Sequence, residues 1–289
     1  MKSLVFLLCF AFGFPLPAAD NVSHFASYHG IKVHYESYGR SAQREPALVF
    51  IHGWTCDLTF WRGQEPVYTR RHSLLIDLPG HGRSDKPRGA YPMEYFARAV
   101  DAVMQDAGVQ SAVLIGHSLG GPIAYAFLRE HSDRAVALVL VDAEVRPGSA
   151  GPLRPEVQRQ QMAARARSMA GPAGDRNFSE SIESMFSEKT TAAVRAEIRT
   201  RMLATPRHVR IAALTSPSSL LPPSPKESFP LPALAIQASS LGMEERFGIM
   251  KTLFPAMRLE AWEGSGHFLM MEEPERFNRS LEAFLTGIP

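Results

Sequence analysis

A serine between glycines, in Gly116-His117-Ser118-Leu119-Gly120, is the first candidate for chemistry in this chain. The apolar run at 112–115 predicts a short buried strand before it, and residues 122–128 after it have helical character. A strand, a tight Gly-x-Ser-x-Gly turn and a helix push a serine hydroxyl out of the backbone. The same five residues also describe a simple glycine-rich turn, so the interpretation depends on what else the chain contains.

Two further segments could complete a reaction site. The predicted strand 47–51 runs into His52-Gly53-Trp54, where a glycine lets the next N–H, that of Trp54, point above the sheet as an oxyanion donor. A tight turn that carries an aromatic core residue explains this segment equally well. The last predicted strand, 258–262, ends in Gly264-Ser265-Gly266-His267-Phe268, and a histidine in such a loop fits a base delivered to the serine.

The elements that must position these residues alternate between strand and helix. After a predicted hairpin (22–28 and 31–37), strand patterns recur at 47–51, 73–76, 112–115, 137–141, 233–238 and 258–262, with helix patterns such as 93–107 and 274–285 between or after them. This order predicts an α/β fold with a mostly parallel sheet and helices on both faces. Ligands of such sheets bind at the carboxyl ends of the strands, where Trp54 and Ser118 both lie.

Several polar residues of the first half are expected to be structural. Asp77 and Ser84 lie in a loop rich in glycine and proline and should bond backbone N–H groups there, and His81 in the same loop follows a strand distant in order from the serine. The hairpin histidines, including His34, lack metal-ligand grouping and are interpreted as surface residues.

The alternation stops after Asp142-Ala143-Glu144. Helical stretches follow at 156–169, 179–186, 192–204 and 207–214, and 216–232 is rich in proline and serine, typical of a return linker. We therefore predict a helical cap with its linker at 146–230, inserted into a core formed by 20–145 and 231–289. Its apolar residues either line the site or hold the cap helices together: Met162, Met169, Ile182, Met185, Phe186 and Met202. Its arginines either attract an acidic substrate or, as surface statistics favour, form a solvated face: Arg154, Arg159, Arg165 and Arg167.

Composition narrows the class of protein. The 289 residues are 45% hydrophobic and 21% charged with a net charge of +2 and no basic block, which gives no sign of a nucleic-acid partner. A short basic start, an apolar run at 4–14 and small residues up to Ala19 are typical of a signal peptide, residues 1–19, and of an exported, periplasmic or secreted protein; an uncleaved anchor is the alternative. The run is too short to span a membrane. Without it the chain keeps one cysteine, Cys56, which we interpret as a packed small hydrophobe.

Taken together, these features resemble the α/β-hydrolase superfamily. The resemblance rests on four motifs in the family's order: His52-Gly53-Trp54, Asp77-Leu78-Pro79-Gly80-His81-Gly82-Arg83-Ser84, Gly116-His117-Ser118-Leu119-Gly120-Gly121 and Gly264-Ser265-Gly266-His267-Phe268. It implies an eight-stranded, mostly parallel sheet, a nucleophilic Ser118, a base His267, an oxyanion hole formed by the N–H groups of Leu119 and Trp54, and no cofactor or metal. Four other residues of these motifs are expected to line the substrate pocket: His52, Gly53, His117 and Phe268.

The acid of the triad departs from the common pattern. Many members carry an aspartate shortly after the strand equivalent to 233–238, but here that loop reads Ser239-Ser240-Leu241-Gly242-Met243 and reaches a carboxylate only at Glu244 and Glu245. Other members place the acid after the preceding strand, where Asp142 stands, with Glu144 two residues on. We predict Asp142, because it can reach the second histidine nitrogen from a strand end without unwinding a helix.

The predicted activity is hydrolysis of a small, apolar carboxylic ester through an acyl-enzyme. Carbon–carbon bond hydrolysis and perhydrolysis are possible with the same triad. A serine nucleophile argues against haloalkane dehalogenase or epoxide hydrolase chemistry. The chain does not contain the motifs expected of a peptidase. A non-catalytic hydrolase-fold binding protein is the alternative from another class. The partner expected is a small molecule, with no stable membrane insertion once the signal is removed; the sequence leaves the oligomeric state open.

Overall fold

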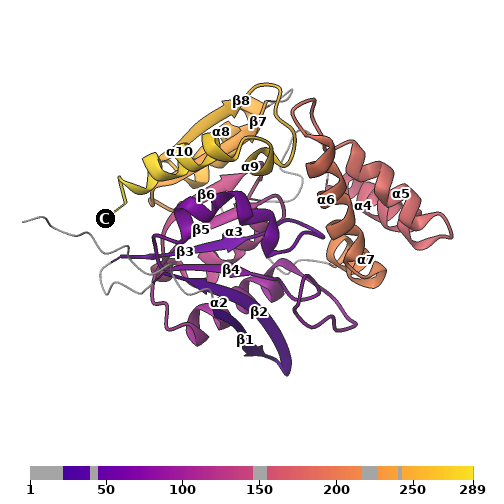
Figure 1. The fold of residues 1–289 in the computed structure, drawn as a ribbon, viewed down its shortest axis with the longest axis horizontal. Coiled ribbons are helices and arrows are strands. Elements are labelled where there is room, and N and C mark those ends of the chain that lie inside the picture. The colour runs from indigo at the N-terminus through magenta and orange to yellow at the C-terminus, as the bar shows by residue number, and fades with distance from the viewer. Residues whose placement is uncertain (1–21, 40–44, 146–154, 217–226, 240–242, 289) are drawn as a thin grey trace, which may run out of the picture.

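The strands form one eight-stranded sheet in the order β1-β2-β4-β3-β5-β6-β7-β8 (Figure 1). The computed structural model describes residues 22–39, 45–145, 155–216, 227–239 and 243–288. β1 and β2 pair antiparallel, as do β2 and β4, and every other neighbouring pair is parallel. The predicted hairpin and the mostly parallel sheet are therefore confirmed. The strands are β1 (Val22–Tyr28), β2 (Ile31–Tyr38), β3 (Ala47–Ile51), β4 (Ser73–Ile76), β5 (Ala112–His117), β6 (Ala135–Val141), β7 (Ala233–Ala238) and β8 (Met257–Trp262).

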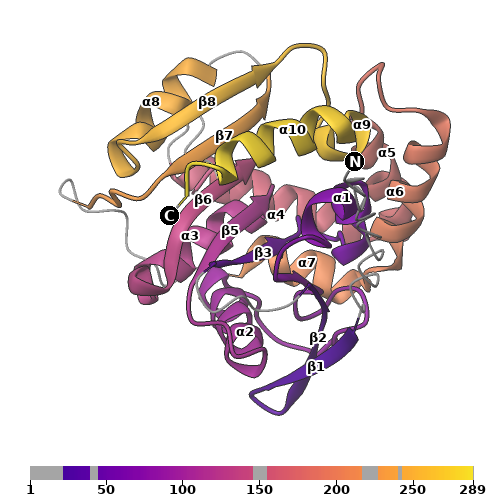
Figure 2. The same cartoon turned by 60° about the vertical axis from the view of Figure 1, so that its left-hand side comes forward.

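The central strands lie inside the protein. Every residue of β3, β4 and β5 is buried, because continuous apolar runs suit strands covered on both faces. In Figures 1 and 2 the β1–β2 hairpin lies at one end of the molecule, and β8 with α8 and α10 lies at the other. The helices outside the insertion are α1 (Glu65–Tyr68), α2 (Met93–Asp106), α3 (Gly120–Glu130), α8 (Met243–Leu253), α9 (Leu269–Glu272) and α10 (Pro274–Leu285), with short 3-10 helices at Leu58–Gln64 and Ser132–Arg134.

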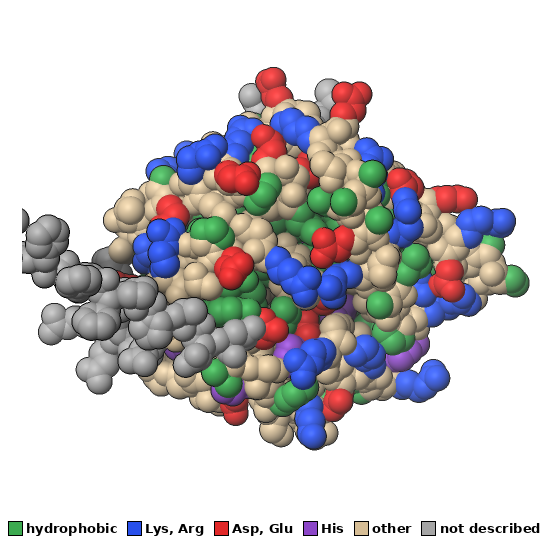
Figure 3. Space-filling view, viewed as in Figure 1, with side chains coloured by type: hydrophobic (Ala, Val, Ile, Leu, Met, Phe, Trp, Pro, Cys, Tyr) green, Lys and Arg blue, Asp and Glu red, His purple; other side chains and the backbone are tan. Residues whose placement is uncertain are grey.

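Four helices are described between β6 and β7, within residues 155–216: α4 (Pro155–Ala170), α5 (Gly174–Glu183), α6 (Ala192–Ala204) and α7 (Arg207–Thr215). We call residues 155–215 the helical insertion. It contacts the loops that follow β3 and β8, since Thr205 Oγ1 donates to Thr55 O at 3.1 Å and His267 N donates to Met185 O at 2.9 Å. Basic and acidic side chains are interspersed on the face shown in Figure 3.

One helix of the insertion, α5, has other bounds than predicted. α5 begins at Gly174, earlier than the predicted 179, and ends at Glu183, before the predicted 186. The predicted signal peptide at 1–19 and parts of the predicted cap and linker, 146–154 and 217–226, fall outside the described residues. No helix in the described ranges is long and apolar enough to cross a membrane.

Asp77, directly after β4, forms hydrogen bonds to the segments that contain Leu58 and Arg83. As predicted, its carboxylate accepts backbone N–H groups, from Leu58 at 2.9 Å and from Arg83 at 2.8 Å. Its third partner was not anticipated: His34 Nδ1 lies 2.7 Å from Asp77 Oδ2, and His34 is only 1% exposed. The prediction of a surface histidine was wrong, because β2 lies between β1 and β4 and carries His34 beside the end of β4.

Candidate active site

Ser118 sits on a strained turn directly after β5. Its φ of 51° lies in the left-handed region, and its N–H donates to Val141 O at 3.0 Å. The flanking glycines are required by close backbone contact: a Cβ on Gly116 would lie 2.5 Å from Gly120 O, and one on Gly120 would lie 2.3 Å from Ile51 O. Strain of this kind is characteristic of functional turns, and here it leaves Ser118 partly exposed.

The structure brings His267 and Asp142 together with Ser118. Ser118 Oγ lies 2.9 Å from His267 Nε2, and His267 Nδ1 lies 2.6 Å from Asp142 Oδ2. Asp142 also has a positive φ, 40°, and its Oδ1 accepts the N–H of Ala238 at 3.0 Å. Three residues from three separate loops thus form one hydrogen-bonded chain, with the geometry that nucleophile, base and orienting acid require.

Of the four acids considered from the sequence, Asp142 therefore occupies the predicted place beside the histidine. Glu144 is partly buried two residues further on, and the side chains of Glu244 and Glu245 fall outside the described residues. Burial acts to raise the pKa of the Asp142 carboxyl, but the hydrogen bond and charge of His267, together with the Ala238 N–H, outweigh it and hold that pKa below its usual value. The carboxylate therefore stays ionised well into acid.

His117 packs behind this chain. Its Nε2 lies 2.9 Å from His267 O, and because a carbonyl only accepts, Nε2 carries the proton. Burial, reinforced by the neighbouring His267, lowers the pKa of His117 to about 3. His117 is therefore a neutral donor that supports the loop of His267 from below.

The two proposed oxyanion donors lie beside the serine. A Cβ on Gly53 would lie 3.0 Å from Ser118 Cβ and 2.9 Å from His117 Nδ1, so the loop after β3 passes directly over the serine turn. Within the described ranges, neither the Trp54 N–H nor the Leu119 N–H donates to a protein acceptor. Both donors are thus available to a ligand oxygen.

The insertion holds Trp54 in place. Its Nε1 donates to Arg210 O at 3.0 Å, and its ring meets the Phe178 ring edge-on with centroids 5.2 Å apart. The Arg165 guanidinium lies 4.7 Å from the centre of the indole, so Arg165 is not the freely solvated side chain favoured by surface statistics. Cys56, nearby, is 2% exposed, and burial raises the pKa of its thiol well above its ordinary value, as suits a packed residue.

The predicted substrate pocket needs correction. His52, His117 and Phe268 have 0% exposed surface, so they pack behind the reacting groups and do not line a cavity. His52 is occupied by loop contacts: Nδ1 lies 2.8 Å from Gly53 O, and Nε2 accepts the Leu78 N–H at 3.0 Å. Gly53 is also buried, with its backbone against Ser118. Half-buried apolar side chains occur instead at Leu119, Met185 and Phe186.

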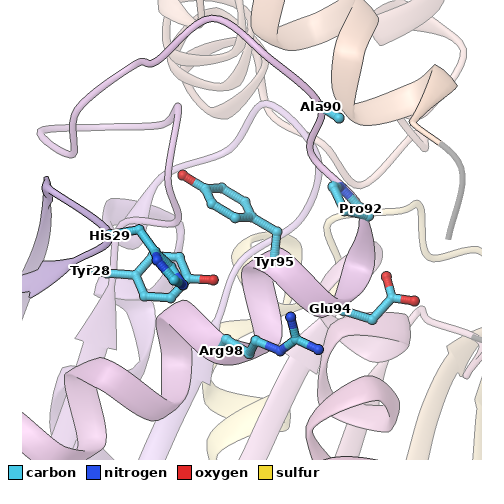
Figure 4. Close-up of a pocket in the computed structure, with 7 residues that line it drawn as sticks. All are labelled: Tyr28, His29, Ala90, Pro92, Glu94, Tyr95 and Arg98. Carbon is cyan, nitrogen blue, oxygen red and sulfur yellow. The ribbon is translucent and has the colours of Figure 1, made fainter. Parts of the chain in front are cut away.

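Two surface pockets lie elsewhere, along α2 and the β1–β2 hairpin. They have volumes of about 450 and 350 Å³ and share Tyr28 and Arg98, and neither is lined by Ser118, His267 or Asp142. Figure 4 shows the first of them. Arg98 there is already bonded to Glu130 through two contacts of 3.0 and 2.9 Å. Within the described residues, no three His, Cys, Asp or Glu side chains group in a way that could hold a metal ion.

The sequence did not reveal the groups that fix two of the three loops of the candidate triad. Asp142 is oriented by a backbone N–H of β7, and the N–H of His267 is bonded to a carbonyl of the insertion. Backbone groups have no residue signature, so no pattern in the chain could have identified them.

Comparisons with known proteins identify the fold. A family model described as alpha/beta hydrolase fold matches residues 46–274. A bifunctional esterase/perhydrolase from Acinetobacter calcoaceticus is 32% identical over 117 residues, which are 39% of this chain and 42% of that protein. An uncharacterized protein of Mycobacterium tuberculosis is 32% identical over 41% of this chain, and the match spans only 34% of its own length.

Solved structures match over nearly the whole chain. A thermophilic esterase from Thermogutta terrifontis is 25% identical, with a TM-score of 0.75 and coverage of 93% of this chain and 98% of that one. An enol-lactonase from Burkholderia xenovorans is 23% identical, with a TM-score of 0.77 and coverage of 91% and 99%, and shows the same fold. With the family model covering most of its length, the chain belongs to the alpha/beta hydrolase fold family.

Proposed function

We propose that this protein is a serine hydrolase that cleaves a small, apolar carboxylic ester through an acyl-enzyme. The observation that carries the proposal is the hydrogen-bonded chain from Ser118 Oγ through His267 to Asp142, with contacts of 2.9 and 2.6 Å. A serine hydroxyl is a weak nucleophile by itself, and an adjacent histidine oriented by a carboxylate is what activates it. The similarity to an esterase/perhydrolase and to solved esterases supports the same class of reaction.

In the proposed reaction, His267 Nε2 takes the Ser118 proton while the serine oxygen attacks the ester carbonyl carbon. Asp142 accepts the Nδ1–H of His267, which keeps Nε2 free to accept and stabilises the imidazolium that forms. The N–H groups of Trp54 and Leu119 bind the oxyanion. His267 then gives its proton to the leaving alcohol, and an acyl-serine remains.

Water completes the cycle. His267 removes a proton from the water, which attacks the acyl carbon, and the second tetrahedral intermediate is held by the same two N–H groups. Its collapse releases the carboxylic acid and returns the proton to Ser118. Each proton moves between oxygen and His267 Nε2, so the residues on hand are sufficient for both halves of the reaction.

The substrate class follows from the partly exposed side chains near the histidine. Met185 and Phe186 are half-buried and apolar, and the Phe186 ring lies 6.1 Å from that of Phe268, next to His267. Several aromatic residues and a methionine near the sequence motifs also suggest an apolar site, but they are buried and core packing explains them equally well: Trp54, Phe60, Trp61, Phe268 and Met270. The proposal of an apolar acyl or alcohol group therefore depends on the insertion.

Labelling by a fluorophosphonate probe tests the proposed function. We expect the wild-type protein to be labelled and Ser118→Ala to be unlabelled with an unchanged melting temperature. A folded protein that resists the probe would favour the non-catalytic binding alternative. A series of nitrophenyl esters of increasing chain length would then define the acyl group, and a probe-reactive protein that cleaves none of them would favour carbon–carbon bond hydrolysis or perhydrolysis.

The proposal includes the cellular location of the protein. Residues 1–19 read as a signal peptide, so we propose that the mature protein is exported and begins near Asp20. Amino-terminal sequencing of the protein recovered from a secretion-competent host tests this, and an intact Met1 on membrane-associated protein would show an uncleaved anchor instead.

A further inference from the structure

The loop between α5 and α6, residues 184–191, lies directly against the loop that carries His267. Met185 O accepts the backbone N–H of His267 at 2.9 Å. A Cβ on Gly266 would lie 2.9 Å from that carbonyl and 2.8 Å from Ser187 N. The two backbones therefore touch, and only glycine fits at the point of contact.

Glu272 joins the two loops through its two carboxylate oxygens. Oε2 accepts the N–H of Gly266 at 2.7 Å, and Oε1 accepts the hydroxyl of Thr190. The Thr190 oxygen in turn accepts the N–H of Ser187 at 2.9 Å. Thr190 is 3% exposed and Glu272 is half-buried, so water has limited access to these bonds. The two bonds to the Glu272 carboxylate are charge-assisted and therefore stronger than bonds between neutral groups.

Lys189 forms a second contact on the outer side. Its ammonium donates to Glu273 Oε1 at 2.7 Å and to Glu263 O at 3.0 Å, on either side of the histidine loop. Its side chain is 37% exposed, and exposed ion pairs contribute little to stability. Thr190 and Glu272 are less exposed than Lys189, and we take their hydrogen bonds as the part of the connection that fixes its geometry.

We infer that Thr190, acting through Glu272, positions His267 for catalysis, so that the helical insertion completes the active site. Neither residue touches a reacting atom; both are positioning residues, and the inference rests on the function proposed above. His267 can take the serine proton only within hydrogen-bond reach, and the present contact is 2.9 Å. A misplacement of about 1 Å can lower a rate about 10²-fold.

The neighbouring threonines provide a matched pair of variants. Thr190→Val removes the hydroxyl that bridges Glu272 and Ser187. Thr191→Val removes a hydroxyl that caps α6 by accepting the Val194 N–H at 3.3 Å, on the same loop but without a bond to residues 263–272. With nitrophenyl esters we expect Thr190→Val to lower kcat about tenfold or more with KM within about twofold, and Thr191→Val to leave both within about twofold.

The pH profile of kcat/KM separates positioning from a general loss of stability, because its acid limb reports the apparent pKa of the base. We expect that limb to move in Thr190→Val and to stay in place in Thr191→Val. Glu272→Gln keeps an oxygen for Gly266 and a polar group for Thr190, so it should retain most of kcat, whereas Glu272→Ala should resemble Thr190→Val. Equal effects of the two threonine variants, or an unaffected Glu272→Ala, would overturn the inference.

A structural readout keeps this test independent of turnover. Amide hydrogen exchange at Gly266 and His267 should accelerate in Thr190→Val and remain as in the wild type in Thr191→Val. If the wild-type protein resists the fluorophosphonate probe and all esters, the proposed function fails. The exchange comparison still decides whether the insertion holds the histidine loop, and unchanged exchange in Thr190→Val contradicts the inference.

Discussion

Replacing Asp142 by asparagine should remove nearly all turnover while leaving the fold intact. Asp142 Oδ1 accepts the Ala238 N–H at 3.0 Å, and Oδ2 accepts the Nδ1–H of His267 at 2.6 Å. An asparagine keeps only one oxygen, and the backbone N–H of Ala238 must have an acceptor. The amide NH₂ then faces His267, where only an unprotonated Nδ1 can accept it, and the imidazole proton moves to Nε2.

The magnitude follows from that change of tautomer. With the proton on Nε2, His267 donates to Ser118 Oγ across the 2.9 Å contact and cannot take the serine proton. In Ser-His-Asp triads this exchange lowers kcat about 10⁴-fold, which corresponds to about 5.5 kcal/mol of lost transition-state stabilisation. The free energy of unfolding should fall by only about 1.5–3 kcal/mol, the range for one hydrogen bond to a charged group.

The assay compares kcat for a nitrophenyl ester in the wild type, Asp142→Asn, Glu144→Gln and Glu244→Gln, with melting temperatures measured on the same samples. The two glutamate variants are matched controls, because each also exchanges a carboxylate for its amide at a position that the sequence offered for the acid. Full activity in Asp142→Asn would refute the reasoning. A loss in Glu244→Gln as large as in Asp142→Asn would show that the acid comes from the loop after β7.

Three other outcomes follow from the same contacts. Gly53→Ala places a Cβ 2.9 Å from His117 Nδ1 and 3.0 Å from Ser118 Cβ, so it should displace the oxyanion loop and lower kcat about 10²–10³-fold; near wild-type kcat would argue against that loop as an oxyanion donor. Asp77→Asn should lower the free energy of unfolding by about 2–4 kcal/mol in denaturant titrations, because a buried carboxylate with three donors is lost; a change within error would contradict this. Burial lowers the pKa of His81 and of His117 to about 3, whereas an unfolded histidine has a pKa near 6.5. Between these two pH values the unfolded chain binds more protons than the folded one, so the unfolding free energy should fall as pH drops from about 6.5 toward 3. A denaturation midpoint that is constant from pH 7 to 4 would be inconsistent with neutral buried histidines.

Much of the fold could be predicted because its signals are local. The apolar runs of β3, β4 and β7 and the helix patterns of α6 and α10 coincide with the observed elements, and the motif around Ser118 forms the predicted strand, turn and helix. The start of α5 was missed because Gly174, a poor helix former, begins it, and its backbone is packed against Met169. Tertiary contact overrode local propensity there.

Burial was harder to predict than secondary structure. His34 was assigned to the surface, yet it lies inside against Asp77, because which strand lies beside β2 is decided by the sheet order. His52, His117 and Phe268 were expected to line a pocket, yet the loops above and below them close over their side chains. Residue type does not distinguish a side chain that faces a ligand from one that packs a loop.

Local sequence pattern was enough to identify candidate reacting residues and the strand ends that carry them, because the serine and the histidine each stand in a short glycine-rich motif after a predicted strand. Only the tertiary structure decided which acid lies beside His267. The loop after β8 reaches back over the end of β7 to β6, and Asp142 is turned toward it by a strained backbone and an N–H of β7. That choice depends on strand order and loop path, which are set by packing of the whole sheet. No short stretch of chain encodes them.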